Sequence, residues 1–174
     1  MNAVPAPVPR ALSGWRWLPL SAAVIVADQL AKSWIVHHFA VFERVRLLPV
    51  LDVILTYNTG AAFSFLSNAA GWQRWLFVGL ALGISALLIT WLRRLRADSH
   101  GLLACGLALI VGGALGNLID RLLHGRVVDF ILAHWGDHMF PAFNVADSAI
   151  TIGAALVILD ALLESRAPRK AGNA

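Results

Sequence analysis

The chain has 174 residues, of which 59% are hydrophobic and 14% are charged, whereas soluble domains carry about 25% charged residues. This shortage of charge excludes an ordinary soluble domain and predicts an integral membrane protein. The formal net charge is +4, but the basic residues lie between apolar segments and form no continuous stripe, so a nucleic-acid-binding protein is not expected.

Four segments are apolar over about the 20 residues that a membrane-spanning helix needs. They cover residues 17–36, 75–92, 101–122 and 143–163. We therefore predict an all-α polytopic membrane protein with four transmembrane helices, in a single domain over residues 17–163. Residues 1–16 are expected to form a disordered cytoplasmic tail, and residues 164–174 a second cytoplasmic tail.

The first segment begins like a signal peptide, because basic residues precede an apolar run. Apolar character resumes after Lys32, however, and no cleavage site of the A-x-A type closes the run. We therefore expect this segment to be retained as a membrane span.

Basic residues near the ends of the spans predict the orientation, because short cytoplasmic loops carry an excess of Lys and Arg. One side carries eight of them: Arg10, Arg16, Arg93, Arg94, Arg96, Arg166, Arg169 and Lys170. The other side carries four: Arg44, Arg46, Arg74 and Arg126. Both termini are therefore expected in the cytoplasm, with the loops 37–74 and 123–142 outside.

The first outer loop is not a simple linker. Its segment VRLLPVLDVILTYN, residues 45–58, is rich in residues that favour strands and predicts one or two short strands with a break at Pro49. Asn58 and Gly60 suit a turn after the strands, and residues 61–66 are compatible with a short interfacial helix.

Three of the predicted spans carry polar residues on one helical face. The third places Asn117, Asp120, Arg121 and His124 at i, i+3, i+4 and i+7, and the fourth repeats this spacing with Asn144, Asp147, Ser148 and Thr151. On the first span, Asp28 and Lys32 are one turn apart. With the predicted orientation, these faces converge just below the outer surface, and Asp129 lies in the loop beyond the third span.

An ionised residue at membrane depth costs about 2.5–3.5 kcal/mol on insertion scales, so such residues either pair or have a function. Asp28 with Lys32, and Asp120 with Arg121 or another partner, can hold helices together. For Lys32 and Asp120 the sequence supports this pairing and a direct catalytic role equally. Arg121 and the asparagines can also be scaffolding.

Asp129 and Asp147 are harder to neutralise, because neither has a basic residue at helical spacing on an established span. Two carboxylates placed close together share a proton and titrate as a pair. One can then deprotonate water while the other donates a proton to a carbonyl oxygen or a leaving group, as in aspartic proteases. This interpretation fits peptide hydrolysis and requires no metal or other cofactor.

Five short motifs occur in order across the four spans: ADQLAK (27–32), YNTGAAFS (57–64), GNLIDR (116–121), VVDFI (127–131) and FNVADS (143–148). Together they closely resemble the lipoprotein signal peptidase family, also called signal peptidase II, over nearly the whole chain between the tails. The resemblance implies an intramembrane aspartyl endopeptidase that removes the signal peptide from bacterial prolipoproteins, just before a cysteine that carries a diacylglyceryl group. It also implies a small extracytoplasmic β-cradle, which agrees with the strands expected in the first outer loop.

By matching motifs, the resemblance makes Asp129 and Asp147 the catalytic pair. Further positions that match the family and are expected to line or support the site are Asp28, Asn58, Asn117, Arg121 and Asn144, and we include Lys32, Gly60 and Asp120 from the same motifs. The implied location is the bacterial cytoplasmic (inner) membrane, with the site near the periplasmic face. The expected partners are modified prolipoproteins and membrane lipid, and the protein is expected to be monomeric.

Three alternatives remain open. His134 and His138, at i and i+4, are a possible zinc-binding pair, although the loop setting and the lack of a further ligand weigh against a metal site. Buried Asp and Arg residues also serve ion- or proton-coupled transporters, but the two halves show no repeat and the charges cluster at one face. A non-enzymatic assembly or lipid-binding protein would tolerate amide replacement of Asp129 and Asp147, which a protease would not.

Overall fold

The computed structural model describes residues 14–60, 71–95, 100–136 and 138–166. The expected interfacial helix over residues 61–66 and most of the two expected tails lie outside the described residues. Gly14–Trp17 form a 3₁₀ turn, η1, in which Gly14 is buried. The end of the expected disordered N-terminal tail is therefore ordered.

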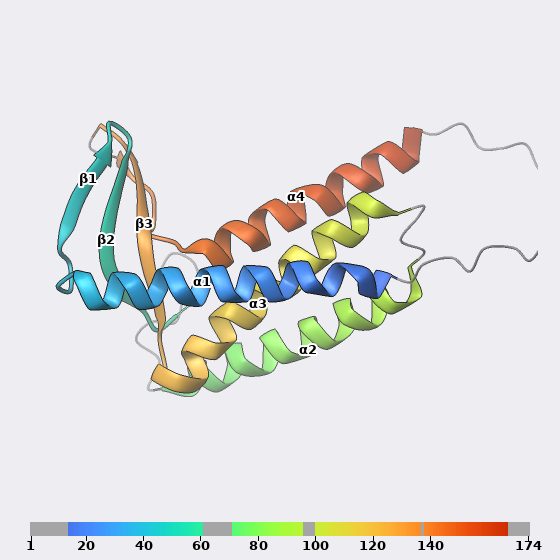
Figure 1. The fold of residues 1–174 in the computed structure, drawn as a ribbon, viewed down its shortest axis with the longest axis horizontal. Coiled ribbons are helices and arrows are strands. Elements are labelled where there is room, and N and C mark those ends of the chain that lie inside the picture. Colours follow the sequence, from blue (N-terminus) through green and yellow to red (C-terminus); the bar gives the residue numbers. More distant parts are fainter. Residues whose placement is uncertain (1–13, 61–70, 96–99, 137, 167–174) are drawn as a thin grey trace, which may run out of the picture.

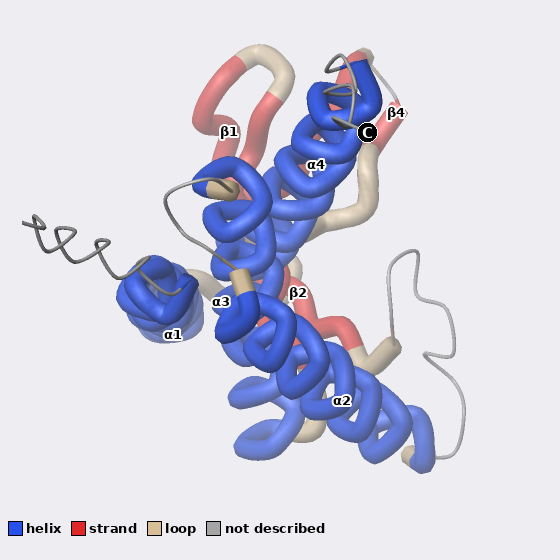
Figure 2. Tube along the Cα trace, turned by 90° about the vertical axis from the view of Figure 1, so that its right-hand side faces the viewer, coloured by secondary structure: helices blue, strands red, loops and turns tan. Residues whose placement is uncertain are grey.

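Most of the described residues lie in four long helices: α1 (Leu18–His38), α2 (Trp72–Arg94), α3 (Gly101–His124) and α4 (Val145–Arg166). Each one covers nearly all of a predicted span, and α4 continues into the expected C-terminal tail. α3 lies in the middle and packs against the other three helices (Figure 2). This central place explains why α3 has the largest set of buried residues among the helices described.

Three of the helices, α2, α3 and α4, are long and apolar enough to cross a membrane. α1 has 21 residues, but Asp28, Gln29 and Lys32 interrupt its apolar sequence. The prediction of a mostly helical protein is thus confirmed, and three of its helices are candidates to span a membrane.

A small antiparallel sheet lies across one end of the helices, opposite the first and last described residues (Figure 1). Its strands are β1 (Arg44–Leu48), β2 (Leu51–Asn58), β3 (Val127–Trp135) and β4 (His138–Met139), in the order β1-β2-β3-β4. β1 and β2 confirm the strands expected in the first outer loop, and the turn between them falls at Pro49 and Val50.

The segment 123–142, predicted as an outer loop, contains strands that the sequence did not indicate, because α3 extends to His124 and β3 and β4 follow. β3 is buried along most of its length, so it lacks the alternation of polar and apolar residues that marks a half-exposed strand. Its register sets Asp129 opposite Thr56 of β2. Asp129 is therefore a strand residue, and the sheet draws strands from both predicted outer loops.

An apolar cluster joins the sheet to the helices. It contains Ile35 of α1, Leu55 of β2, and Val128 and Phe130 of β3, all of them buried. Because apolar side chains from one helix and two strands share this cluster, the sheet is fixed against the end of α1.

Two glycines allow α3 and α4 to cross closely. A Cβ added at Gly106 would lie 2.7 Å from the carbonyl oxygen of Gly153, and one added at Gly153 would lie 2.6 Å from the carbonyl oxygen of Gly106. Neither position has room for a side chain, so the backbones of α3 and α4 are in direct contact at this crossing.

We expect Gly106→Val to lower stability, because the new side chain meets helix backbone that cannot move aside. Overpacking of this kind costs about 1–3 kcal/mol. Thermal unfolding of the purified protein in detergent measures the change. Gly79→Ala on α2 is the matched control, since a Cβ there meets nothing within 4 Å, and it should unfold at or slightly above the wild-type temperature. Equal melting temperatures for Gly106→Val and wild type would contradict the close crossing.

Candidate active site

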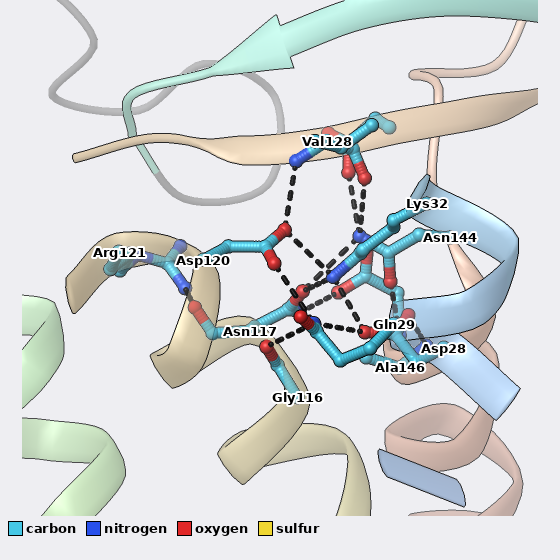
Figure 3. Close-up of polar contacts among 12 residues, drawn as sticks. Asp28, Gln29, Lys32, Gly116, Asn117, Asp120, Arg121, Val128, Asn144 and Ala146 are labelled. Atoms are coloured by element: carbon cyan, nitrogen blue, oxygen red, sulfur yellow. Dashed lines mark hydrogen bonds and ion pairs between the residues drawn. The ribbon is translucent and has the colours of Figure 1, made fainter. Parts of the chain in front are cut away.

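A buried ionic cluster lies where α1 and α3 approach the sheet (Figure 3). Lys32 Nζ lies 2.7 Å from Asp28 Oδ2 and 3.0 Å from Asp120 Oδ2. The exposed fractions of Asp28, Lys32 and Asp120 are 0%, 3% and 3%. The predicted Asp28–Lys32 pair is therefore confirmed, and the partner of Asp120 is Lys32 rather than its neighbour Arg121.

Gln29 completes this cluster, and it is not among the site residues predicted from the sequence. Its Nε2 donates to Asp120 Oδ1 at 2.9 Å and to the carbonyl oxygen of Gly116 at 3.2 Å. A neutral amide in an apolar segment is a weak signal. The only sequence signal for Gln29 is its place beside Asp28 in the ADQLAK motif.

The two carboxylates of the cluster also hold the backbone of β3 and α4. Asp120 Oδ2 accepts the Val128 N–H at 3.1 Å, at the start of β3. Asp28 Oδ1 accepts the Ala146 N–H at 2.9 Å, in the first turn of α4. Each of these backbone donors belongs to the residue immediately before an aspartate of the predicted dyad.

Asp129 and Asp147 line the same cavity, which has a volume of about 950 Å³ and lies between the sheet and the start of α4. Asp129 is buried and Asp147 is half-buried. Polar residues that share the lining include Thr56, Asn58, Thr59, Asn117, Arg121, Ser148 and Thr151, and apolar ones include Phe42, Ile54, Leu132, Phe140 and Phe143. The cavity therefore combines a small polar region with a large apolar wall.

Asn144 connects the two aspartates. It precedes α4, and its Oδ1 accepts the Asp147 N–H at 2.9 Å, as an N-cap side chain does. Its Nδ2 consequently faces β3, where it lies 2.7 Å from Asp129 Oδ1 and 3.2 Å from the Val128 carbonyl oxygen. One fully buried amide thus serves as a helix cap and as a donor to the neighbouring carboxylate.

Two more asparagines donate to the aspartates. Asn117 Nδ2 lies 2.7 Å from Asp147 Oδ1. Asn58 gives a side-chain hydrogen bond to Asp129, while its own Oδ1 accepts the Gly60 N–H at 2.9 Å. Each carboxylate therefore has at least one fixed amide donor.

Arg121 ties the turn after β2 to α3. Its Nη2 donates to the Gly60 carbonyl oxygen at 3.1 Å, and its Nη1 donates to the Asn117 carbonyl oxygen at 3.3 Å. All ten site residues predicted from the sequence are thus brought together in one region. His124, which shares the predicted polar face of α3, is exposed, whereas Thr151 lines the cavity.

Burial and the negative charge of Asp147 raise the pKa of Asp129 from 3.8 to about 7. Hydrogen bonds from two asparagines and the charge of Lys32 act in the opposite direction without cancelling the shift. A carboxyl group that keeps its proton near neutral pH can act as an acid, and an ionised carboxylate beside it can act as a base.

Among the described residues, those that line the cavity include no His or Cys, and the two histidines of the zinc alternative lie elsewhere. The ring of His134 lies 3.2 Å from Asp52 Oδ1. The register sets His134 opposite Met139 and Trp135 opposite His138. Because neighbouring strand residues point to opposite faces, the two histidines face away from each other, and a zinc site that uses both is not supported.

A second group of possible metal ligands lies at the opposite end of the helices. Side-chain atoms of His100, Asp160 and Glu164 lie within 4.8 Å of one another. Glu164 is exposed, and the other two are half-buried. These residues are remote from the cavity and take no part in the site.

The signal peptidase (SPase) II family model matches residues 20–163. The chain is 54% identical over 156 residues to the lipoprotein signal peptidase of Shewanella oneidensis, which covers 88% of this chain and 90% of that protein. It is 50% identical over 158 residues to the lipoprotein signal peptidase of Shewanella halifaxensis, covering 91% of this chain and 92% of that protein. A bacterial membrane enzyme solved by the in meso method at 2.3 Å resolution matches with a TM-score of 0.79 at 31% identity, over 91% of this chain and 94% of that chain.

The raised pKa of Asp129 makes stability depend on pH. The unfolded carboxyl ionises near its ordinary value of 3.8, whereas the folded one keeps its proton up to about 7. The folded state therefore binds more protons in this window, so the stability that this group contributes is complete below pH 3.8 and is lost as the pH rises through about 7.

We expect Asp129→Asn, which cannot ionise, to match the wild-type melting temperature near pH 4 and to exceed it near pH 8. Each kcal/mol of unfolding free energy that the wild type loses by ionising Asp129 corresponds to a difference of about 2–4 °C. Thermal unfolding in detergent across this range measures the difference between the two proteins. A difference that does not grow with pH would contradict the shifted ionisation.

Proposed function

The chain belongs to the signal peptidase II family, and from this premise we propose how its cavity catalyses cleavage and how the protein lies in the membrane. The family and its lipoprotein signal peptidase relatives make the protein a membrane-bound protease that cleaves signal peptides from prolipoproteins. They do not favour an ion-coupled transporter or a non-enzymatic binding protein.

The proposed catalytic groups are Asp129 and Asp147. The observation that carries this proposal is that both carboxylates line one cavity, while Asn144 forms hydrogen bonds with both residues. The negative charge of Asp147 also raises the pKa of Asp129, as expected for two carboxyl groups that share one proton.

The different surroundings of the two aspartates support different roles. Asp129 is buried and has a pKa of about 7, so it begins protonated and donates a hydrogen bond to the scissile carbonyl oxygen. Asp147 is half-buried and faces the cavity, so in a pair that shares one proton it is proposed to be the ionised member, which accepts a proton from water.

The reaction then proceeds in two steps, as in aspartic proteases. The water oxygen bonds to the carbonyl carbon, the water proton passes to Asp147, and the proton of Asp129 passes to the carbonyl oxygen, which gives a neutral diol. Asp147 next gives its proton to the leaving nitrogen while the C–N bond breaks. One hydroxyl of the diol returns a proton to Asp129, so both carboxyl groups regain their starting states.

The remaining polar residues support this pair in the proposed site. Asn58, Asn117 and Asn144 hold the two carboxylates, and Arg121 with Gly60 holds the turn after β2. The ion cluster of Asp28, Lys32 and Asp120 holds the helices. The mechanism requires no metal or other cofactor.

The apolar wall of the cavity supports a lipid-bearing substrate. Phe42, Ile54, Leu132, Met139 and Phe140 belong to the lining, and apolar surfaces of this kind suit acyl chains. The proposed substrate is a prolipoprotein that is cleaved just before a cysteine carrying a diacylglyceryl group.

α1 is proposed as the fourth membrane span, besides α2, α3 and α4. Its 21 residues are enough to cross about 30 Å of hydrocarbon. Asp28 and Lys32 are buried against α3, while Val26, Leu30 and Trp34 are exposed. An outer face made of apolar residues is what contact with lipid requires.

The proposed location is the bacterial inner membrane, with both termini in the cytoplasm and the cavity near the periplasmic face. The excess of basic residues near the termini and after α2 supports this orientation, and the sheet lies at the end away from the termini (Figure 1). The protein is proposed to act as a monomer with one peptidase domain over residues 17–163, flanked by two cytoplasmic tails.

Asp129→Asn and Asp147→Asn are each expected to lower kcat by about 10²–10⁴-fold, because each removes a group that transfers a proton. Cleavage of a diacylglyceryl-modified prolipoprotein by purified protein in detergent measures the effect. Asp160→Asn, at the far end of α4, is the control and should cleave at the wild-type rate. A chelator should leave wild-type cleavage unchanged. Normal cleavage by both dyad variants would rule out this pair, and loss of cleavage with chelator would return attention to a metal.

The proposed orientation is tested by labelling single cysteines in a Cys105→Ser background. Trp135→Cys, at a residue of the sheet that is 79% exposed, should react with a membrane-impermeant maleimide added to intact spheroplasts. Arg94→Cys, at the end of α2, should react only after the membrane is permeabilised. The reverse labelling pattern would contradict the proposed orientation, because it would place the termini outside and the cavity on the cytoplasmic side.

A further inference from the structure

The three asparagines of the site, Asn58, Asn117 and Asn144, share one arrangement of hydrogen bonds. Each amide turns its carbonyl oxygen toward a hydrogen-bond donor and its NH₂ group toward an aspartate. An ionised carboxylate only accepts hydrogen bonds, so at Asp147, the ionised member of the proposed pair, a reversed Asn117 amide would set oxygen against oxygen. The orientation of each amide therefore decides whether its aspartate receives a donor, and something must fix that orientation.

For two of the asparagines, backbone N–H groups fix the orientation. Asn58 Oδ1 accepts the Gly60 N–H at 2.9 Å, and Asn144 Oδ1 accepts the Asp147 N–H at 2.9 Å. A backbone amide cannot rotate away without moving the chain. These two orientations are therefore built into the turn after β2 and the start of α4.

Asn117 differs, because its carbonyl oxygen accepts from side chains. Lys32 Nζ lies 2.8 Å from Asn117 Oδ1, and Asn144 Nδ2 lies 3.2 Å from the same oxygen. Asn144 shares its NH₂ group with two other acceptors. The charged lysine, with the shorter contact, is thus the stronger of the two donors.

Lys32 is itself held in one arrangement. An ammonium group has three donors and no acceptor, and each donor has one partner: Asp28 Oδ2 at 2.7 Å, Asp120 Oδ2 at 3.0 Å and Asn117 Oδ1 at 2.8 Å. The two carboxylates direct the third N–H at Asn117 (Figure 3). Since the ammonium cannot accept a hydrogen bond, Asn117 must present its oxygen to Lys32 and its NH₂ group to Asp147.

We propose that Lys32 is a positioning residue for the peptidase reaction: by fixing the orientation of the Asn117 amide, it holds Asp147 in place to activate water. This inference rests on the proposed function of the Asp129–Asp147 pair. Lys32 does not line the cavity, so it acts on the reaction through its neighbours, and Asn117 is the neighbour that contacts the Asp147 carboxylate.

The pairing of helices alone does not account for this arrangement. A lysine that only neutralised the two carboxylates would need two acceptors, and its third donor could face any carbonyl. Here the third donor faces the one amide that binds Asp147. Loss of Lys32 is therefore expected to lower kcat and to leave KM nearly unchanged, because the cavity wall that binds substrate is not altered.

Several charged groups act on the pair at once. The charged groups around the Asp129–Asp147 pair are Asp28 and Lys32 on α1 and Asp120 and Arg121 on α3. The two aspartates, on β3 and α4, also act on each other. Loss of Lys32 alone removes a positive charge and should move the acidic limb of the pH–rate profile to higher pH. A variant that also neutralises Asp120 keeps the net charge of the cluster and should show a smaller movement.

The test is a double-mutant cycle between Lys32→Met and Asn117→Ala, with the charge-matched variant Lys32→Met/Asp120→Asn beside it. That variant leaves no unpaired Asp120 charge, so it remains informative if Lys32→Met folds poorly. Rates are measured per folded molecule on a diacylglyceryl-modified prolipoprotein. Ser21→Ala is the structural control, because it removes a buried α1–α3 hydrogen bond of 2.7 Å from Ser21 Oγ to the Ala108 carbonyl oxygen, and its kcat should equal that of wild type.

We expect Lys32→Met and the charge-matched variant each to lower kcat by about 10–100-fold, as small misplacements of catalytic groups do. In the Asn117→Ala background, loss of Lys32 should lower kcat by less than about 3-fold, because both residues act through one contact. Additive losses, or full kcat in the charge-matched variant, would overturn the positioning role. Asp147→Asn is measured in parallel: if it cleaves normally, the proposed dyad fails, whereas an inert Asp147→Asn with additive losses refutes only the role of Lys32.

Discussion

The ammonium group of Lys32 is buried between two carboxylates, and the arrangement of α1, α3, α4 and β3 around the site depends on this cluster. A buried charge is strongly unfavourable unless it is paired and hydrogen-bonded. Here every donor of the ammonium group has an acceptor, and the acceptors come from two helices. Removing one member of a buried ion pair costs about 3–5 kcal/mol, so the depth and rotation of α1 against α3 are fixed by chemistry as well as by packing.

The same carboxylates determine where the proposed dyad lies. The oxygen of Asp28 that does not bind Lys32 accepts a backbone N–H in the first turn of α4, and Asp120 accepts one at the start of β3. Backbone groups buried away from water require partners, and these two find them on the ion cluster. Because each belongs to the residue just before a dyad aspartate, satisfying the backbone also fixes the two catalytic candidates relative to each other.

The sequence allowed the prediction of those parts whose signal is local. Asp28 and Lys32, one turn apart in an apolar segment, could be paired from their spacing, and each long helix lies where its apolar run predicted it. β3 could not be recognised in this way, because a strand buried on both faces loses the period of two and its partner lies some 70 residues earlier in the chain. The contacts of Asn117 and Gln29 depend on which helices meet, and no local pattern encodes that.

The placement of the two aspartates on different kinds of element suits a substrate held in lipid. In the proposed setting, Asp147 lies in the first turn of a spanning helix, while Asp129 lies on a strand that does not enter the membrane. A scissile bond that joins a membrane-embedded signal peptide to a protein outside must cross the boundary between these elements. A purely helical site would supply both groups from within the bilayer, where water is scarce. In the proposed orientation, the strand instead brings the second carboxyl group to the boundary, and the half-buried Asp147 lies on its membrane side, where water from the periplasm would reach both.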